Sequence, residues 1–166
     1  SQIVALLNEH FEIINRVVEA ENGTLDKFIG DAAMAFWGAP DAMPDHATRA
    51  CRAALAISEA VTALNARSDG PSLQIKIGIH CGPLIVGNIG SRTRMNYTVI
   101  GDTVNVCARI EALAGAYTEN RHATVLVSGE VVEAVGEAFE FESIGDQFVK
   151  GREQAVTVWR LVRAAV

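Results

Sequence analysis

Three stretches of the chain have apolar residues at three- and four-residue spacing, which is the period of an amphipathic helix. The first stretch runs from Gln2 to Ala20 and is stopped by Asn22-Gly23. The second begins after Asp45, which can cap it, and ends before Asp69. The third runs from Asp102 to Gly115, where the glycine can close the helix. The pattern therefore predicts three long helices.

Runs rich in apolar and β-branched residues lie between and after these helices, and they predict strands. A turn at Gly30-Asp31 joins two of the runs into a β-hairpin, and the tight link at Cys81-Gly82 predicts a second hairpin. The expected strands are Thr24–Ile29, Ala32–Trp37, Leu73–His80, Pro83–Gly90, Tyr97–Ile100, Thr124–Val127, Phe139–Ile144 and Val156–Val162, with a short helix at Ser128–Val135.

Helices that alternate with hairpins favour an α+β domain with a mixed or antiparallel sheet of the split βαβ, ferredoxin-like kind. A doubly wound parallel sheet is less favoured, because hairpins join antiparallel neighbours. The chain has no low-complexity tract, linker or internal repeat. Residues 1–166 are therefore expected to form one domain, long enough to bury a core of its own.

Composition narrows the class of protein. The net charge of −6 argues against a nonspecific nucleic-acid binder, which needs a basic surface. Three cysteines, far apart and without metal-ligand spacing, fit a reducing, cytoplasmic compartment. No run reaches the roughly 18 apolar residues of a membrane span, so this domain is not expected to contact a membrane itself. A larger, membrane-anchored protein could still contain it.

The first predicted hairpin carries two charged residues that could do chemistry. Asp31 follows Gly30, so a sharp turn can present its carboxylate at the end of the sheet. Such an oxygen suits Mg²⁺, although an aspartate in a turn more often only stabilises the turn. Lys27 interrupts an otherwise apolar strand, and it is either a lysine that reaches to solvent or a donor to a ligand.

Two polar residues of the third predicted helix form a second candidate pair. Asn105 and Arg109 are four residues apart and share one helical face. Arg109 could simply pair with Glu111 or Glu119, or both polar side chains could address one ligand. A guanidinium suits phosphate, because its planar fork donates two parallel hydrogen bonds.

Other chemistry-bearing residues give weaker signals. Lys150 lies in the turn "FVKGRE" between two late strands and is ordinarily a solvated hairpin lysine. The four histidines have neither ligand spacing nor a nucleophile partner in the sequence, and no role is assigned to them: His10, His46, His80 and His122.

Five sequence segments, taken together and in order, resemble a known family more specifically than any single residue does. They are "TLDKFIGDAAMAFWGAP", "DHATRACRAALAI", "IKIGIHCGPLIVGNIGS", "RMNYTVIGDTVNVCARIEAL" and "VKGRE". In order and spacing they resemble the catalytic domain of class III adenylate/guanylate cyclases, and the similarity runs from about Ile3 to Val162. The resemblance implies conversion of a nucleoside triphosphate to a 3′,5′-cyclic monophosphate and pyrophosphate, with two Mg²⁺ or Mn²⁺ ions at a site shared by a head-to-tail homodimer.

The resemblance also implies roles for single residues. Asp31 matches a metal-binding aspartate. Lys27 and Thr98 match the two base-reading positions, and this pair is typical of adenylate cyclases of the threonine type. Asn105 and Arg109 match the residues that stabilise the transition state. The lysine that binds the triphosphate is matched by Lys150. A lysine can only donate hydrogen bonds, which suits the ring-nitrogen acceptors of adenine, so ATP is the expected substrate and cyclic AMP the expected product.

The chain departs from the family pattern at one place. The first metal-binding aspartate of the family lies on a strand before the first helix, in a Phe-x-Asp-Ile-x-x-Phe-Thr pattern. Ser1 already lies in the segment that leads to that helix, and Asp26, Asp41 and Asp45 are in the wrong places to substitute. We therefore expect a domain that lacks its N-terminal strand. Catalytically inert binding modules and guanylate cyclases are the alternatives, and residues 1–166 alone are expected to bind metal poorly.

Overall fold

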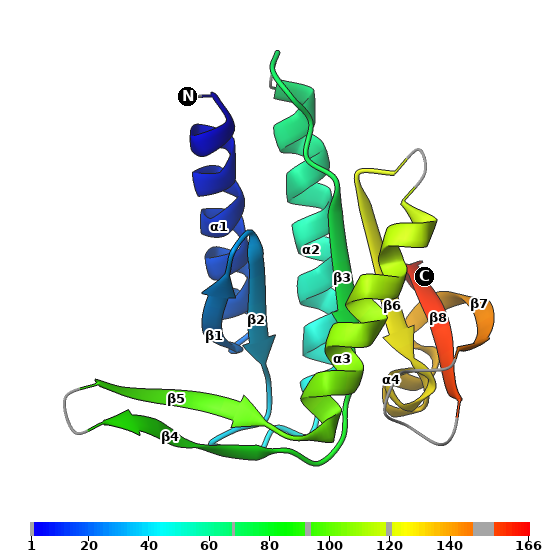
Figure 1. The fold of residues 1–166 in the computed structure, drawn as a ribbon. Helices are drawn as coiled ribbons and strands as arrows, with labels where there is room; N and C mark the ends of the chain where they lie inside the picture. Colours follow the sequence, from blue (N-terminus) through cyan, green and yellow to red (C-terminus); the bar gives the residue numbers. More distant parts are fainter. Residues whose placement is uncertain (1, 68, 92–93, 119–120, 148–154) are drawn as a thin grey trace.

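The structure is a computed structural model that describes residues 2–67, 69–91, 94–118, 121–147 and 155–166 (Figure 1). Its elements confirm an α+β architecture in which helices pack on a mixed sheet. They are α1 (Gln2–Ala20), β1 (Thr24–Ile29), β2 (Ala32–Phe36), α2 (His46–Arg67), β3 (Ile75–Ile79), β4 (Ile85–Ser91), β5 (Arg94–Ile100), α3 (Asp102–Leu113), η1 (Ala114–Tyr117), β6 (Ala123–Ser128), α4 (Gly129–Val135), η2 (Gly136–Ala138), β7 (Phe139–Gln147) and β8 (Val156–Ala164).

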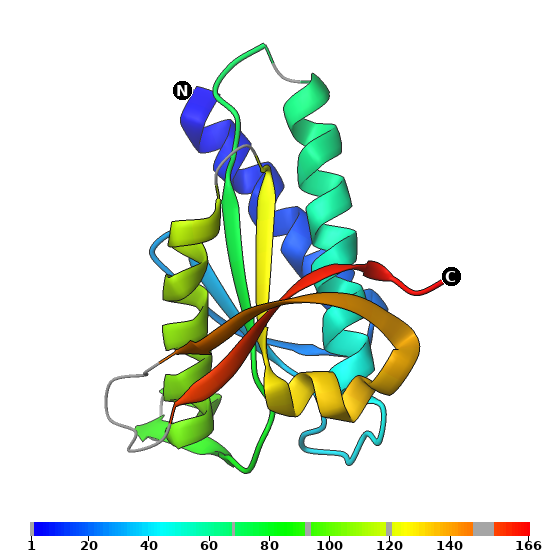
Figure 2. The same cartoon turned by 90° about the vertical axis from the view of Figure 1, so that its right-hand side faces the viewer.

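Four strands form the central sheet in the order β3-β6-β8-β7. Strand β6 runs parallel to β3 and antiparallel to β8, which pairs antiparallel with β7. The side chains of β6 alternate between two cores, as the two-residue period of a strand requires. Val125 and Val127 pack with α2 and α4, whereas Leu126 packs with Val106 and Ile110 of α3. The sheet is therefore covered by α3 on one face and by α2 and α4 on the other (Figure 2).

Helix α1 packs on α2 through its apolar stripe. Ile13 and Val17 of α1 contact a cluster that includes Ile57, Val61 and Leu64 of α2. The sequence prediction for this helix, Gln2–Ala20, is confirmed. Among the described residues, no helix is both long enough and apolar enough to cross a membrane.

The β1–β2 hairpin lies beside α1 and is fixed at its open end by Trp37. The indole Nε1 donates a hydrogen bond to the carbonyl oxygen of Glu21 at 3.1 Å. Its ring covers Gly23, where an added Cβ would come within 2.5 Å of a ring carbon. At the closed end, Gly30 has φ +61°, a left-handed conformation that glycine adopts without strain. The first predicted hairpin is confirmed.

The second predicted hairpin is wrong. Strand β3 does not turn back through Cys81-Gly82 onto β4; it pairs with β6, and β4 pairs with β5 in a separate two-stranded ribbon. The chain leaves β3 with Gly82 at φ +159°, and the Thr103 hydroxyl donates a hydrogen bond to the carbonyl oxygen of Pro83. This hydrogen bond joins the segment between β3 and β4 to the start of α3. The ribbon therefore projects to one side of the molecule, and its second strand begins at Arg94, earlier than predicted (Figure 1).

Candidate active site

Lys27 lies on β1 next to an irregularity that changes the direction of its side chain. Leu25 pairs with Ala35 and Lys27 pairs with Met34, so Asp26 is the extra residue of a β-bulge. The Asp26 side chain is 2% exposed, while that of Lys27 is 47% exposed. Their Oδ2 and Nζ atoms are 3.8 Å apart. The bulge thus buries the carboxylate and leaves the ammonium half in solvent, where a ligand can reach it.

Asp31 is exposed in the turn between β1 and β2. Its negative charge raises the pKa of His10, although burial of the imidazole lowers that pKa by more. A carboxylate is a suitable oxygen donor for Mg²⁺ or Mn²⁺. Within the described ranges, however, no group of three or more histidine, cysteine, aspartate or glutamate side chains could hold a metal ion. The donor type fits the predicted ions, but the described residues do not complete a two-ion site.

Asn105 and Arg109 lie on α3 with exposed side chains, one turn apart. Neither side chain makes a hydrogen bond or ion pair with the residues that the structure describes. The alternative partner Glu111 instead lies 3.9 Å from Lys76, measured between Oε1 and Nζ. Glu119, the other alternative partner, is outside the described residues. The helix therefore presents an amide and a guanidinium to solvent.

The structure describes only the backbone of Thr98, and it does not describe Lys150. Thr98 lies on β5, where its backbone pairs with Gly87 of β4. Its side chain is outside the described atoms, and so is the whole of Lys150, which falls between β7 and β8 in the sequence.

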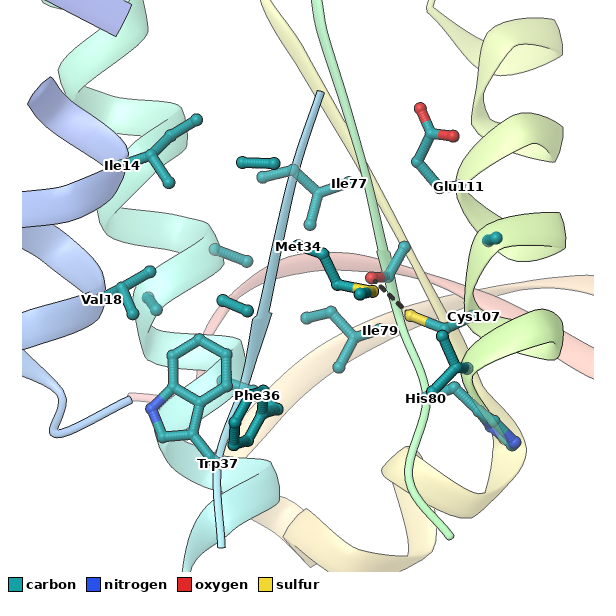
Figure 3. A pocket seen from close by; sticks show the side chains of 18 of the residues that line it. Ile14, Val18, Met34, Phe36, Trp37, Ile77, Ile79, His80, Cys107 and Glu111 are labelled. Carbon is teal, nitrogen blue, oxygen red and sulfur yellow. Dashed lines mark hydrogen bonds between the residues drawn. The ribbon is translucent and has the colours of Figure 1, made fainter. Parts of the chain in front are cut away.

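A cavity of about 910 Å³ separates the hairpin from the central sheet. Figure 3 shows Met34 of β2 and Ile77 and Ile79 of β3 along it, with α1 on one side and Cys107 of α3 on the other. The Cys107 thiol donates a hydrogen bond to the carbonyl oxygen of Gly78 at 3.3 Å. Asp31 also lines this cavity.

Helix α3 has three faces with different surroundings. Val106 and Ile110 are buried against the sheet. Val104, Cys107, Ala108 and Glu111 line the cavity, whereas Asn105 and Arg109 do not. At 100° per residue, these three sets lie roughly 120° apart around the helix. The structure therefore does not bring Asn105 and Arg109 to the Asp31 side of α3 within a single chain.

Burial disfavours the thiolate form of the three cysteines. Loss of solvent raises the pKa of Cys51 to about 12 and that of Cys107 to about 11. It also raises the pKa of Cys81. Because the thiolate is the reactive form, none of the three is a candidate nucleophile.

The structure brings together three residues that the sequence pattern could not connect. His80 Nδ1 lies 2.8 Å from Ser128 Oγ and 3.2 Å from Glu130 Oε2. A nucleophilic triad needs the serine and the carboxylate on different ring nitrogens, and here both face the same nitrogen. The His80 side chain is 5% exposed, so the cluster instead joins the end of β6 and the start of α4 to the segment after β3.

Comparison with known proteins shows to which family this fold belongs. Residues 1–162 match the family model of the adenylate and guanylate cyclase catalytic domain. The chain belongs to this family.

The similar proteins include enzymes named as adenylate cyclases and enzymes named as guanylate cyclases. The chain is 39% identical over 164 residues to adenylate cyclase 1 of Rhizobium meliloti, covering 97% of this chain and 24% of that protein. The crystal structure of the adenylyl cyclase CyaB from P. aeruginosa has a TM-score of 0.87 at 28% identity, covering 99% and 84% of the two chains. The guanylyl cyclase Cya2 has a TM-score of 0.88 at 31% identity, covering 98% and 81%. This chain therefore spans about a quarter of the Rhizobium protein.

Proposed function

We propose that this domain is an adenylate cyclase that converts ATP to 3′,5′-cyclic AMP and pyrophosphate at an interface between two copies of the chain. The ribose 3′-hydroxyl gives its proton to water and its oxygen attacks the α-phosphorus, while the bond from that phosphorus to the oxygen that bridges to the β-phosphorus breaks and pyrophosphate leaves. The observation that carries the choice of adenine is Lys27, a half-exposed donor at the position that reads the base in the family.

Arg109 and Asn105 act on the reacting groups in this proposal. The guanidinium of Arg109 neutralises the charge that grows on the α-phosphoryl oxygens, and Asn105 orients the ribose. Support comes from their exposure and from the lack of any side-chain partner among the described residues. Thr98 accepts a hydrogen bond from the adenine amino group, and Lys150 holds the triphosphate.

Asp31 holds a divalent ion in this proposal, either Mg²⁺ or Mn²⁺. Bound there, such an ion would lower the pKa of the ribose hydroxyl and would neutralise charge on the departing pyrophosphate. Among the described residues, no three or more histidine, cysteine, aspartate or glutamate side chains gather in a group that could hold a metal ion. That observation favours a second candidate function, a cyclase-homology module that binds nucleotide without turning it over.

The proposed site needs two chains, because a single chain holds Asp31 apart from Asn105 and Arg109. Asp31 lines the cavity on one face of α3, while Asn105 and Arg109 occupy another face. In a head-to-tail homodimer, Asp31 of one copy would meet Lys27, Asn105 and Arg109 of the other. Solved relatives include a guanylyl cyclase domain described as a non-canonical dimer and another in complex with GTP.

The test incubates the full-length protein with Mn²⁺ and either ATP or GTP, and measures cyclic nucleotide at several protein concentrations. We expect cyclic AMP in excess of cyclic GMP, with specific activity that rises with protein concentration as dimers form. Excess cyclic GMP would establish a guanylate cyclase. Nucleotide binding without product at any concentration would establish the inert module.

A further inference from the structure

The bulge in β1 brings together two charged groups that a regular strand would keep apart. Neighbouring side chains of a regular strand point to opposite faces of the sheet. Between Leu25 and Lys27, however, β1 advances by two residues while β2 advances by one, so Asp26 is the extra residue. A bulge of this kind re-aims a side chain. Here it leaves Asp26 Oδ2 and Lys27 Nζ 3.8 Å apart, although the two residues adjoin in the sequence.

The two partners differ in exposure, and the difference indicates which of them is fixed. The side chain of Asp26 is 2% exposed, whereas that of Lys27 is 47% exposed. A buried side chain is held in one rotamer by its neighbours, while a lysine in solvent keeps its rotamer freedom. A buried carboxylate is also costly without hydrogen bonds or a charge partner, and the Lys27 ammonium is one such partner. Asp26 is therefore a fixed anionic group beside a cation that can otherwise move.

A second lysine pair of the domain shows what the burial of Asp26 adds. Lys76 Nζ and Glu111 Oε1 are 3.9 Å apart, but the Glu111 side chain is 40% exposed. Exposed pairs of this kind contribute little, because both side chains lose rotamer freedom and water screens their charges. In the Asp26–Lys27 pair only the lysine has such freedom to lose. The two pairs have nearly equal distances, so burial of the carboxylate is what distinguishes them.

We propose that Asp26 is a positioning residue, which holds the ammonium of Lys27 at the place where the base is read. The inference rests on the proposed function, in which Lys27 donates a hydrogen bond to a ring nitrogen of adenine. Asp26 does not touch the nucleotide. It restricts the Lys27 side chain before ATP binds, so that less rotamer freedom is lost on binding.

The ion pair itself is tested in the full-length protein without nucleotide, with nitrogen-15 in the lysine side chains. The Lys27 ammonium signal is identified by its absence from Lys27→Gln. Asp26→Asn, which keeps the size of the side chain and removes its charge, should shift that signal and leave the Lys76 signal in place. Glu111→Gln is the matched control and should shift the Lys76 signal alone. An unmoved Lys27 signal in Asp26→Asn would overturn the proposal.

The effect on base reading is measured as initial rates with ATP and GTP. We expect Asp26→Asn to raise KM for ATP about 3- to 10-fold with kcat nearly unchanged, because the base takes no part in the bond changes. Use of GTP should not fall in parallel, since a lysine cannot accept the hydrogen bonds that the guanine N–H groups donate. Glu111→Gln should change neither. An equal loss with both nucleotides in Asp26→Asn would indicate general damage to the structure and refute the proposal.

A double-mutant cycle separates an effect through Lys27 from an effect on the fold of the hairpin. In the Lys27→Gln background no ammonium remains for Asp26 to hold. The further effect of Asp26→Asn on KM for ATP should therefore fall below about 2-fold in that background. Equal effects in the two backgrounds would show that Asp26 acts on the fold and not on Lys27, against the proposal.

These outcomes are separate from the test of cyclase activity. Excess cyclic GMP, or binding without turnover, contradicts the adenylate cyclase proposal, yet the ammonium signal still shows whether Asp26 holds Lys27. When the protein makes no product, the dissociation constant for ATP replaces KM in both comparisons. A shifted ammonium signal without any change in KM or affinity for ATP would mean that the pair does not serve base reading, and would overturn the proposal.

Discussion

At the scale of single residues, we predict that Lys27 determines which base the domain reads. It is a donor placed in solvent by a β-bulge, and its exposed fraction of 47% nearly equals the 44% of Lys76. A glutamate at position 27 would face the adenine edge with an acceptor. We predict that Lys27→Glu lowers kcat/KM for ATP about 10- to 100-fold and shifts the preference toward GTP.

The measurement is initial-rate kinetics with both nucleotides on the full-length enzyme. Lys27→Gln and Lys76→Gln form a matched pair, since each removes one half-exposed ammonium. The first should weaken ATP use and the second should not. Unchanged ATP kinetics in both Lys27 variants would take this residue out of the base pocket.

The cysteines give a prediction that depends on pH. Burial disfavours the thiolate and raises the pKa of Cys107 to about 11, against an ordinary value of 9.0. At pH 8 its thiolate fraction is therefore about 100-fold lower than that of an exposed thiol. We predict that iodoacetamide labels Cys107 and Cys51 of the native protein at least about 100-fold more slowly than in urea.

Mass spectrometry of the labelled peptides checks this prediction. The rate should rise about tenfold for each pH unit above 8, because the thiolate fraction rises until pH reaches the pKa. Rapid native labelling at pH 8 would mean that these thiols are less buried than the structure has them.

At the scale of elements, the contact of α3 with β3 depends on one glycine. A Cβ on Gly78 would lie 2.5 Å from the Glu111 nitrogen and 2.8 Å from the Cys107 oxygen, both backbone atoms of α3. We predict that Gly78→Ala displaces α3 and lowers the free energy of unfolding by about 1–3 kcal/mol. Since α3 carries Asn105 and Arg109, cyclase activity should fall as well.

Gly87→Ala is the matched control, because nothing lies within 4 Å of a Cβ at that position on β4. Urea unfolding of the two variants compares them directly. Equal stabilities would show that α3 and β3 are not in close backbone contact.

The elements also show which features could be read from the sequence. Helix α1 and the β1–β2 hairpin were predictable, because a repeat of apolar residues and a Gly-Asp turn are local signals. The pairing of β3 was not, because its partner β6 lies more than 40 residues away and no local pattern encodes that register. The joining of His80 to Ser128 depends on the same long-range pairing. The roles of Lys27, Asp31, Asn105 and Arg109 remain predictions from motif and position.

At the scale of the whole molecule, the separation of Asp31 from Arg109 makes complementation between copies measurable. In a mixture of Asp31→Ala and Arg109→Ala chains, half of the dimers are mixed, and one of the two sites in each mixed dimer is intact. We predict that the mixture regains about a quarter of wild-type activity, although each variant alone is inactive.

A mixture of Lys27→Glu and Arg109→Ala chains is the control. In the proposed dimer, both changes fall on the side of the site that one copy supplies, so every site in the mixed dimer would be damaged and activity should stay low. Two affinity tags show whether mixed dimers form. Mixed Asp31→Ala and Arg109→Ala dimers without recovered activity would contradict the head-to-tail arrangement.

Helix α3 is only 12 residues long, and it contacts the sheet on one face, lines the cavity with a second and carries Asn105 and Arg109 on the third. A helix shifts as a rigid body. Any displacement of the cavity face, which carries Val104 and Ala108, therefore also displaces the face that carries Asn105 and Arg109. Catalytic groups misplaced by 1 Å can lose about 100-fold in rate. In the proposed mechanism, a displacement of α3 from its cavity side therefore slows turnover without a change in any reacting group.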